Sequence, residues 1–223
     1  MKKPSLPFCD FSGRAGTLGL ALALAFAALP SAATQAQYLP PVGPATTLVM
    51  LRDTGELTTS TLGAVSSATP DIAVTGIAAG HTLVAIDIRP QTQGLYGLTV
   101  NATSDQAQLV HISLETGAAT GVGPEFGFTI GGNTVDLPAN QSWDIDFNPA
   151  VDRLRVVSSF GLNFRVNPNT GAPVDAFPGS NGINPDDFIN GAATGLQGAA
   201  YTNSQPNADS FTTLYTLDPV TNN

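Results

Sequence analysis

The chain has 223 residues, of which 17 are acidic and 8 are basic, so its formal net charge is −9. Nucleic acids and anionic membrane surfaces bind basic patches, and a chain with so few cations excludes both as partners. The length suits one domain with a core of its own.

The first 36 residues have the organisation of an export signal. Lys2, Lys3 and Arg14 precede an apolar run at 17–29, and small residues follow that run. About 20 apolar residues are needed to cross a bilayer, so this run is too short to remain inserted once the signal is cleaved. We expect an exported protein, periplasmic or secreted, that meets an unknown ligand in that compartment.

Cleavage of the signal also removes the single cysteine. Cys9 lies within the signal, so the mature chain is expected to have no disulfide, no thiol nucleophile and no thiolate ligand. No cofactor is predicted. Removing 1–36 takes three of the eight basic residues and one of the seventeen acidic residues, which leaves a net charge of about −11. Residues 37–45 form a Pro-rich leader, and 46–223 are predicted to form a single β-repeat domain.

Two sequence elements recur beyond residue 45. The first is a strand that ends in a proline turn and is followed by a second strand. It occurs at 83–98 and again at 143–157, where Pro90 and Pro149 lie 59 residues apart. Short β-branched or alternating stretches between turn residues are typical of antiparallel hairpins.

The second element is an apolar strand followed by a Thr-Gly turn. It occurs at 48–63, 109–123 and 164–174, and 214–222 repeats it with Asn in place of Gly. One unit therefore contains two hairpins, and four antiparallel strands in about 50 to 60 residues is the size of a propeller blade. The predicted fold class is all-β, a propeller-like array of four-stranded antiparallel repeats. A stack of sandwich hairpins is the main alternative, and a β-solenoid needs shorter, more regular repeats.

The last unit stops after one strand and its turn, so the array is expected to be incomplete at the C-terminus. Its final strand is then expected either to have an open edge or to borrow the strand at 48–51 to close the ring.

Three longer segments carry a family resemblance. They are LVAIDIRPQTQGLYGLTVNATSDQAQLVHISLETGAATGVG, VDLPANQSWDIDFNPAVDRLRVVSSFGLNFRVNPNTG and GAAYTNSQPNADSFTTLYTLDPVTN. These segments resemble a family of exported bacterial proteins known only as a domain of unknown function. The resemblance implies propeller-type repeats behind a signal peptide. It implies no catalytic residue, because no activity is established for the family.

The segment SWDIDFNPAVDRLRVV holds the candidate binding residues. They are Asp144, Asp146, Asn148, Asp152 and Arg155. Strand alternation places the first three of these on the face opposite the apolar side chains. With a turn at 149–152, Asp146 faces Arg155 and Asn148 faces Arg153. We predict a cross-strand ion pair from this register.

Two chemical readings compete with the ion pair. The first hypothesis is a Ca²⁺ site whose oxygen ligands come from Asp144, Asp146, Asn148 and Asp152. An EF-hand loop, however, has Gly and Glu at the positions where this chain has Pro149 and Arg155. Residues i and i+2 on a strand also stand about 7 Å apart, too far to share one ion. Paired carboxylates of a glycosidase are the second reading.

Other polar residues have simpler interpretations. His81 and His111 lack a second histidine at ligand spacing, so no metal site is predicted. Asp186 and Asp187 lie among turn-forming residues and are expected in a solvated loop.

The apolar residues around the candidate segment are predicted to form the core. They are Trp143, Ile145, Phe147, Leu154, Val156, Phe164 and Val166. Because no catalytic motif is recognisable, the leading hypothesis is a non-catalytic binding or interaction module. The alternatives are a secreted carbohydrate-active enzyme with paired carboxylates and a calcium-stabilised structural protein.

Overall fold

The computed structural model describes residues 47–62, 71–187, 189, 195–206, 208 and 211–218. The predicted signal and leader lie outside these residues. Every regular element in the described part is a β-strand, which confirms the all-β prediction. None of the residues described belongs to a helix long and apolar enough to span a membrane.

The strands are short and mostly arranged as hairpins. They are β1 Thr47–Leu51, β2 Glu56–Thr61, β3 Ile72–Ala73, β4 Thr82–Arg89, β5 Gly94–Asn101, β6 Gln106–Ile112, β7 Ala119–Phe126, β8 Thr129–Ile130, β9 Asn133–Thr134, β10 Trp143–Asn148, β11 Arg153–Ser158, β12 Asn163–Val166, β13 Gly198–Tyr201 and β14 Leu214–Leu217.

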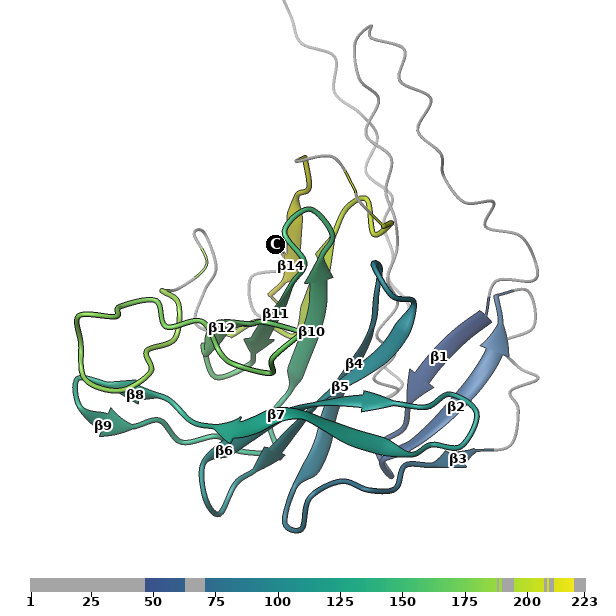
Figure 1. Cartoon of the computed structure of the whole chain (residues 1–223), viewed down its shortest axis with the longest axis horizontal. Coiled ribbons are helices and arrows are strands. Elements are labelled where there is room, and N and C mark those ends of the chain that lie inside the picture. Colours follow the sequence, from purple (N-terminus) through teal and green to yellow (C-terminus); the bar gives the residue numbers. More distant parts are fainter. Residues whose placement is uncertain are drawn as a thin grey trace, which may run out of the picture.

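These strands form separate antiparallel sheets that follow one another in space (Figure 1). Their orders are β1-β2-β3, β4-β5-β6-β7, β10-β11-β12 and β13-β14, with a small β8-β9 hairpin. Strand β10 contacts both β4 and β13, so the first strands of three successive sheets lie side by side. This arrangement is the propeller-like array that the repeats predict. Within the described ranges only β4–β7 has all four strands, and an isolated bridge from Val166 to Pro173 extends β10–β12.

The proline turns repeat as predicted. After β4, Gln93 has a φ of 57° and its N–H donates to the Arg89 carbonyl over 2.8 Å. After β10, Asp152 has a φ of 50° and its N–H donates to the Asn148 carbonyl over 2.9 Å. Both residues follow their proline by three positions, so the two hairpins use the same turn.

The Thr-Gly turns also bring neighbouring sheets together. Gly117 and Gly171 close their turns with φ values of 73° and 69°. A Cβ atom at Gly117 would collide with the carbonyl of Ala73 in β3, and one at Gly171 with the carbonyl of Val122 in β7. Each turn therefore lies against the outermost strand of the preceding sheet, at a distance that only glycine permits.

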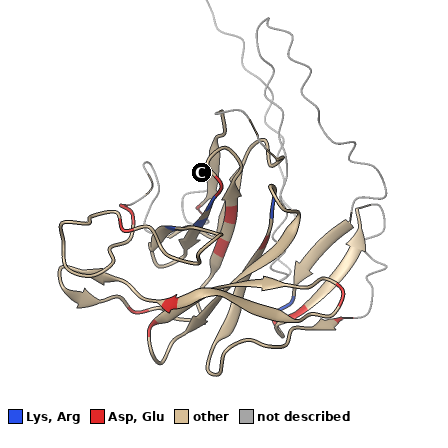
Figure 2. Cartoon of the chain, in the orientation of Figure 1, with Lys and Arg blue, Asp and Glu red and all other residues tan. Residues whose placement is uncertain are grey.

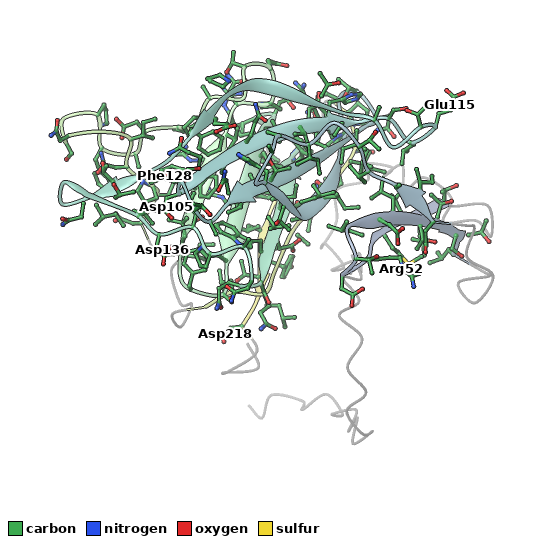
Figure 3. The ribbon with its side chains drawn as sticks, turned by 90° about the horizontal axis from the view of Figure 1, so that it is seen from below. Arg52, Asp105, Glu115, Phe128, Asp136 and Asp218 are labelled. Atoms are coloured by element: carbon green, nitrogen blue, oxygen red, sulfur yellow. The ribbon has the colours of Figure 1, made fainter. Side chains whose placement is uncertain are left out.

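The core consists of two apolar layers, one on each face of the β4–β7 sheet. The layer towards β10–β12 contains all seven predicted core residues, which are buried, together with Phe126 and Phe128. The layer towards β1–β3 includes Leu57 and Leu95. Strand β5 is buried along nearly its whole length because sheets cover it on both sides. Figure 3 shows Phe128 towards one side of the molecule and Arg52 towards the other.

The strand expected at 48–51 lies in a sheet of its own. It forms β1, which pairs with β2 and packs against the β4–β7 sheet, and the described residues show no pairing between β1 and β14. In the described part of the chain β14 pairs with β13 alone, and Tyr215 and Leu217 on β14 are exposed. Residues 219–223, which include the predicted last turn, lie outside the described residues.

Replacing Phe164 with alanine tests the inner core. The Phe164 ring is fully buried and contacts the rings of Phe126 and Phe128. Phe164→Ala should lower the free energy of unfolding by about 3 to 5 kcal/mol, because the truncation leaves a cavity. Phe211→Ala is the matched control, since that ring is 81% exposed, and it should change stability by less than about 0.5 kcal/mol. Urea denaturation followed by circular dichroism measures both, and equal losses would contradict the assignment of the core.

Candidate functional site

Three aspartates lie on the inner strands, where successive sheets meet. Asp87 belongs to β4, and Asp144 and Asp146 belong to β10. Their side chains are half-buried, and Figure 2 shows acidic residues along β10. The segment that sequence analysis selected therefore lies on the central strand of the array.

Asp87 binds the free edge of β10. In an antiparallel strand, the backbone groups of alternate residues point to opposite edges. Among the described residues, no strand is hydrogen-bonded to the edge of β10 that faces away from β11. At that edge the N–H of Phe147 donates to Asp87 Oδ2 over 2.9 Å. A carboxyl from the preceding sheet thus satisfies an amide that would otherwise lack a partner.

Asp144 and Asp146 do the same for the next inner strand. The N–H of Ala199 donates to Asp144 Oδ2 over 2.7 Å, and the N–H of Tyr201 donates to Asp146 Oδ2 over 2.6 Å. Both amides belong to β13. The aspartates of one inner strand therefore fasten the following sheet to it.

This carboxyl–amide hydrogen bond recurs at the equivalent position of two repeats. Asp87 precedes Pro90 by three residues, and Asp146 precedes Pro149 by three. Each holds an amide of the next inner strand. Since equivalent positions make equivalent bonds, the carboxyls are part of the repeat architecture.

The three carboxyl groups have raised pKa values. Burial raises the pKa of Asp144 to about 6, although the N–H of Ala199 opposes the rise. Burial is also the main cause that raises the pKa of Asp146, and the charge of Asp87 adds to it. The pKa of Asp87 rises for the same main reason, while its hydrogen bond with Phe147 opposes the rise. The carboxyl groups of Asp87 and Asp146 interact directly, so one shared proton suits the pair better than two charges.

Asn148 and Asp152 shape the turn and its attachment to the neighbouring sheet. Asn148 Oδ1 accepts the N–H groups of Ala150 and Val151 inside the turn. Asp152 forms an ion pair with Arg89, whose Nε lies 2.8 Å from Asp152 Oδ1. Arg89 is itself buried, so this ion pair joins the two proline turns in a partly desolvated setting.

The predicted ion pair between Asp146 and Arg155 is wrong, although their register is confirmed. Asp146 turns to the β13 amide instead. Arg155 Nη1 donates to Asn163 Oδ1 over 2.7 Å and to Asp186 Oδ2 over 2.8 Å. The long arginine side chain reaches past its cross-strand neighbour to a loop carboxylate 31 residues further on.

Two observations on the described residues bear on the calcium and glycosidase hypotheses. No three His, Cys, Asp or Glu side chains in the described ranges gather so as to hold a metal ion. A glycosidase needs two carboxyl groups held apart across a cleft. Here Asp87 and Asp146 contact each other, and each already accepts a backbone amide.

A separate pocket lies beside the β8–β9 hairpin. Its volume is about 330 Å³, and its walls are mostly apolar. The residues that line it include Ile130, Phe160, Leu162, Phe177, Asn184 and Asp187. The Phe160 ring packs edge-on against Trp143 at 4.9 Å between centroids, so this wall rests on the core.

Hydrogen bonds hold the outer wall of the pocket in place. Asp175 Oδ1 accepts the backbone N–H groups of Phe177 and Asn184, each over 3.1 Å, which closes the loop at its base and lowers the pKa of Asp175. The N–H of Thr129 donates to the Ile183 carbonyl over 2.8 Å and ties the loop to β8. These bonds therefore fix the outer wall of the pocket relative to β8.

The expectation of a solvated loop is wrong for Asp186. Its side chain is 13% exposed and forms ion pairs with Arg155 and Arg165. Asp187 is exposed, as expected for a loop residue. Sequence reasoning missed the pocket because Phe160 and Phe177 lie in turn-rich segments whose packing has no periodic signal.

Comparison with known proteins identifies a family for the chain but assigns it no activity. A family model described as Domain of unknown function (DUF4394) matches residues 56–223. Since this match covers most of the chain, the chain belongs to that family, and the resemblance seen in the sequence is confirmed. No curated protein and no solved structure matches the chain.

The raised pKa values predict a stability that depends on pH. A carboxyl whose pKa is raised by folding stabilises the protein while it is protonated, and that contribution is lost as pH rises through the folded-state pKa. The wild type should therefore lose stability as pH rises from about 4, near the ordinary pKa of an aspartate, to about 9, the pKa of Asp146. Asp146→Asn keeps an oxygen for Tyr201 but cannot ionise, so it should lose about 1 to 2 kcal/mol less over that range. Thermal melts at intervals of pH measure the difference, and parallel curves would contradict it.

Asp186 should matter far more for folding than its neighbour. Asp186→Asn leaves the guanidinium groups of Arg155 and Arg165 without their carboxylate, and it should cost about 1 to 3 kcal/mol. Asp187→Asn is the matched control at an exposed site and should change stability by less than about 0.5 kcal/mol. Urea denaturation compares the two variants. An equal effect would mean that the ion pairs of Asp186 contribute nothing measurable.

Proposed function

We propose that this member of the DUF4394 family is an exported, non-catalytic binding module whose ligand site is the pocket beside β8–β9. The observation that carries the proposal is a pocket of about 330 Å³ whose lining is mostly apolar and includes Phe160 and Phe177. Small-molecule sites are typically concave, mostly apolar and supplied with a few polar groups, and their volumes begin at about 300 Å³.

The construction of the pocket supports a binding role. Phe160 is backed by Trp143, and the loop that holds Phe177 is closed by Asp175 and tied to β8 by Thr129. A site that is already shaped loses little conformational entropy when it binds. Phe177 is 43% exposed, so a ligand that covers it gains apolar burial.

The distribution of carboxylates supports binding over hydrolysis. Two aspartates line the pocket, but Asp186 is committed to Arg155 and Arg165. That leaves Asp187 as the one carboxylate on the pocket wall, within the described residues, that is free to act. A glycosidase mechanism needs two. Export, which places the site outside the cytoplasm, rests on the N-terminal sequence pattern.

A neutral fluorescent dye tests the pocket. Prodan, an environment-sensitive naphthalene dye, should bind the purified protein with a blue-shifted emission, because the site is apolar. Phe177→Ala should weaken that binding about tenfold or more, as expected when a ligand loses contact with an aromatic side chain. Phe211→Ala removes an equally large ring elsewhere and should leave the titration unchanged. Absence of a saturable signal, or equal affinities in the wild type and Phe177→Ala, would contradict the proposal.

Catalysis is tested separately. The purified protein should not turn over glycan or peptide libraries. Turnover that disappears in Asp187→Asn or Asp146→Asn would replace the binding module with a hydrolase.

A further inference from the structure

We infer that the ligand of this pocket is a small organic cation, an apolar group that carries an amine, and that Asp187 selects its charge. The inference rests on the proposed binding function and names the chemical class that the site prefers. It follows from the walls, from an inventory of the polar groups and from the positions of the charges.

The apolar lining of the pocket favours a ligand with an apolar group. Phe160 and Leu162, from the connection between β11 and β12, and Phe177, from the loop after β12, line one space together with Ile130 and Val135. An aliphatic or aromatic group is desolvated there, and the face of a phenylalanine ring also attracts a cation.

The side-chain donors of the pocket are already used. Asn163 Nδ2 donates to the Asp187 carbonyl over 2.7 Å, and Asn163 Oδ1 accepts from Arg155. Asn184 Nδ2 donates to Asp175 and to the Gly182 carbonyl. Among the described residues that line the pocket, no Lys, Arg or His side chain is present.

The side-chain atoms that stay available are acceptors. They are Asn184 Oδ1 and the carboxylate of Asp187, for which the described part of the chain supplies no side-chain partner. A ligand that donates hydrogen bonds is therefore matched, whereas a carboxylate or a phosphate finds only other acceptors.

The positions of the charged residues favour a positively charged hydrogen-bond donor over a neutral one. Arg155 and Arg165 both bind Asp186, and neither lines the pocket. The two arginines and two aspartates sum to zero, so the preference comes from Asp187 being at the wall and not from local net charge. A charged donor makes a hydrogen bond to a carboxylate that is roughly twice as strong as a neutral donor makes, so an amine should bind better than an alcohol of the same shape.

Three ligands of one shape test the inference. They are 3-phenylpropylamine, 3-phenylpropan-1-ol and 3-phenylpropanoate, each used to displace prodan from the purified protein at low salt. The amine should bind about tenfold tighter than the alcohol, and the propanoate should bind weakest. Added salt should reduce the advantage of the amine and leave the alcohol unchanged.

The variant Asp187→Asn assigns the selectivity. It should abolish the advantage of the amine and keep the affinity for the alcohol, and an unchanged melting temperature would show that the fold is intact. Phe177→Ala should weaken amine and alcohol together. If the three ligands bind alike, or if Asp187→Asn keeps the preference for the amine, the cation inference is wrong while the binding site stands. If prodan itself does not bind, the proposed function fails first.

Discussion

The structure depends on how the free edge of each inner strand is satisfied. A propeller-like array places the first strand of every sheet next to the axis, where one edge has no neighbouring strand and its amides still need acceptors. In this chain the acceptors are side-chain carboxyls of the preceding sheet. Asp87 accepts a backbone amide of β10, and Asp144 and Asp146 accept backbone amides of β13. One set of bonds therefore satisfies an edge and joins two sheets at the same time.

This solution has an electrostatic cost. Carboxyls that approach a neighbouring strand lose water, and those that approach one another repel when both are charged. The pKa values of all three rise accordingly. The ion pair between Arg89 and Asp152 lies at the end of the same strands and uses opposite charges instead. The two junctions show that neighbouring sheets can be joined either by carboxyl–amide hydrogen bonds or by an ion pair.

Local sequence predicted most of the framework, because its signals act over short distances. The turns after Pro90 and Pro149, the glycine turns and the seven core residues follow from alternation and turn chemistry, and the structure confirms them. The partners of Asp146 and Arg155 could not be predicted in this way. Their register was correct, yet each side chain binds a segment that the fold brings near from far along the chain. Which of two facing charges prefers a distant partner depends on the sheet that lies next to them, and no pattern within one hairpin contains that information.

The pocket could not be predicted from the sequence for a related reason. Its position shows that a connection between strands can form a pocket without altering the repeat. The regular units place Trp143 and Phe164 in the core, and the longer connection after β12 is free to fold over the outer side of that core. Asp175 and Thr129 fix this connection through backbone hydrogen bonds, and Asp186 anchors it to arginines of β11 and β12. The charged residues that attracted attention in the sequence therefore mostly hold sheets and loops in place. The lining of the pocket comes mainly from apolar side chains of the connections, with Asp187 among them, because a rigid scaffold allows a loop to vary without disturbing the repeats.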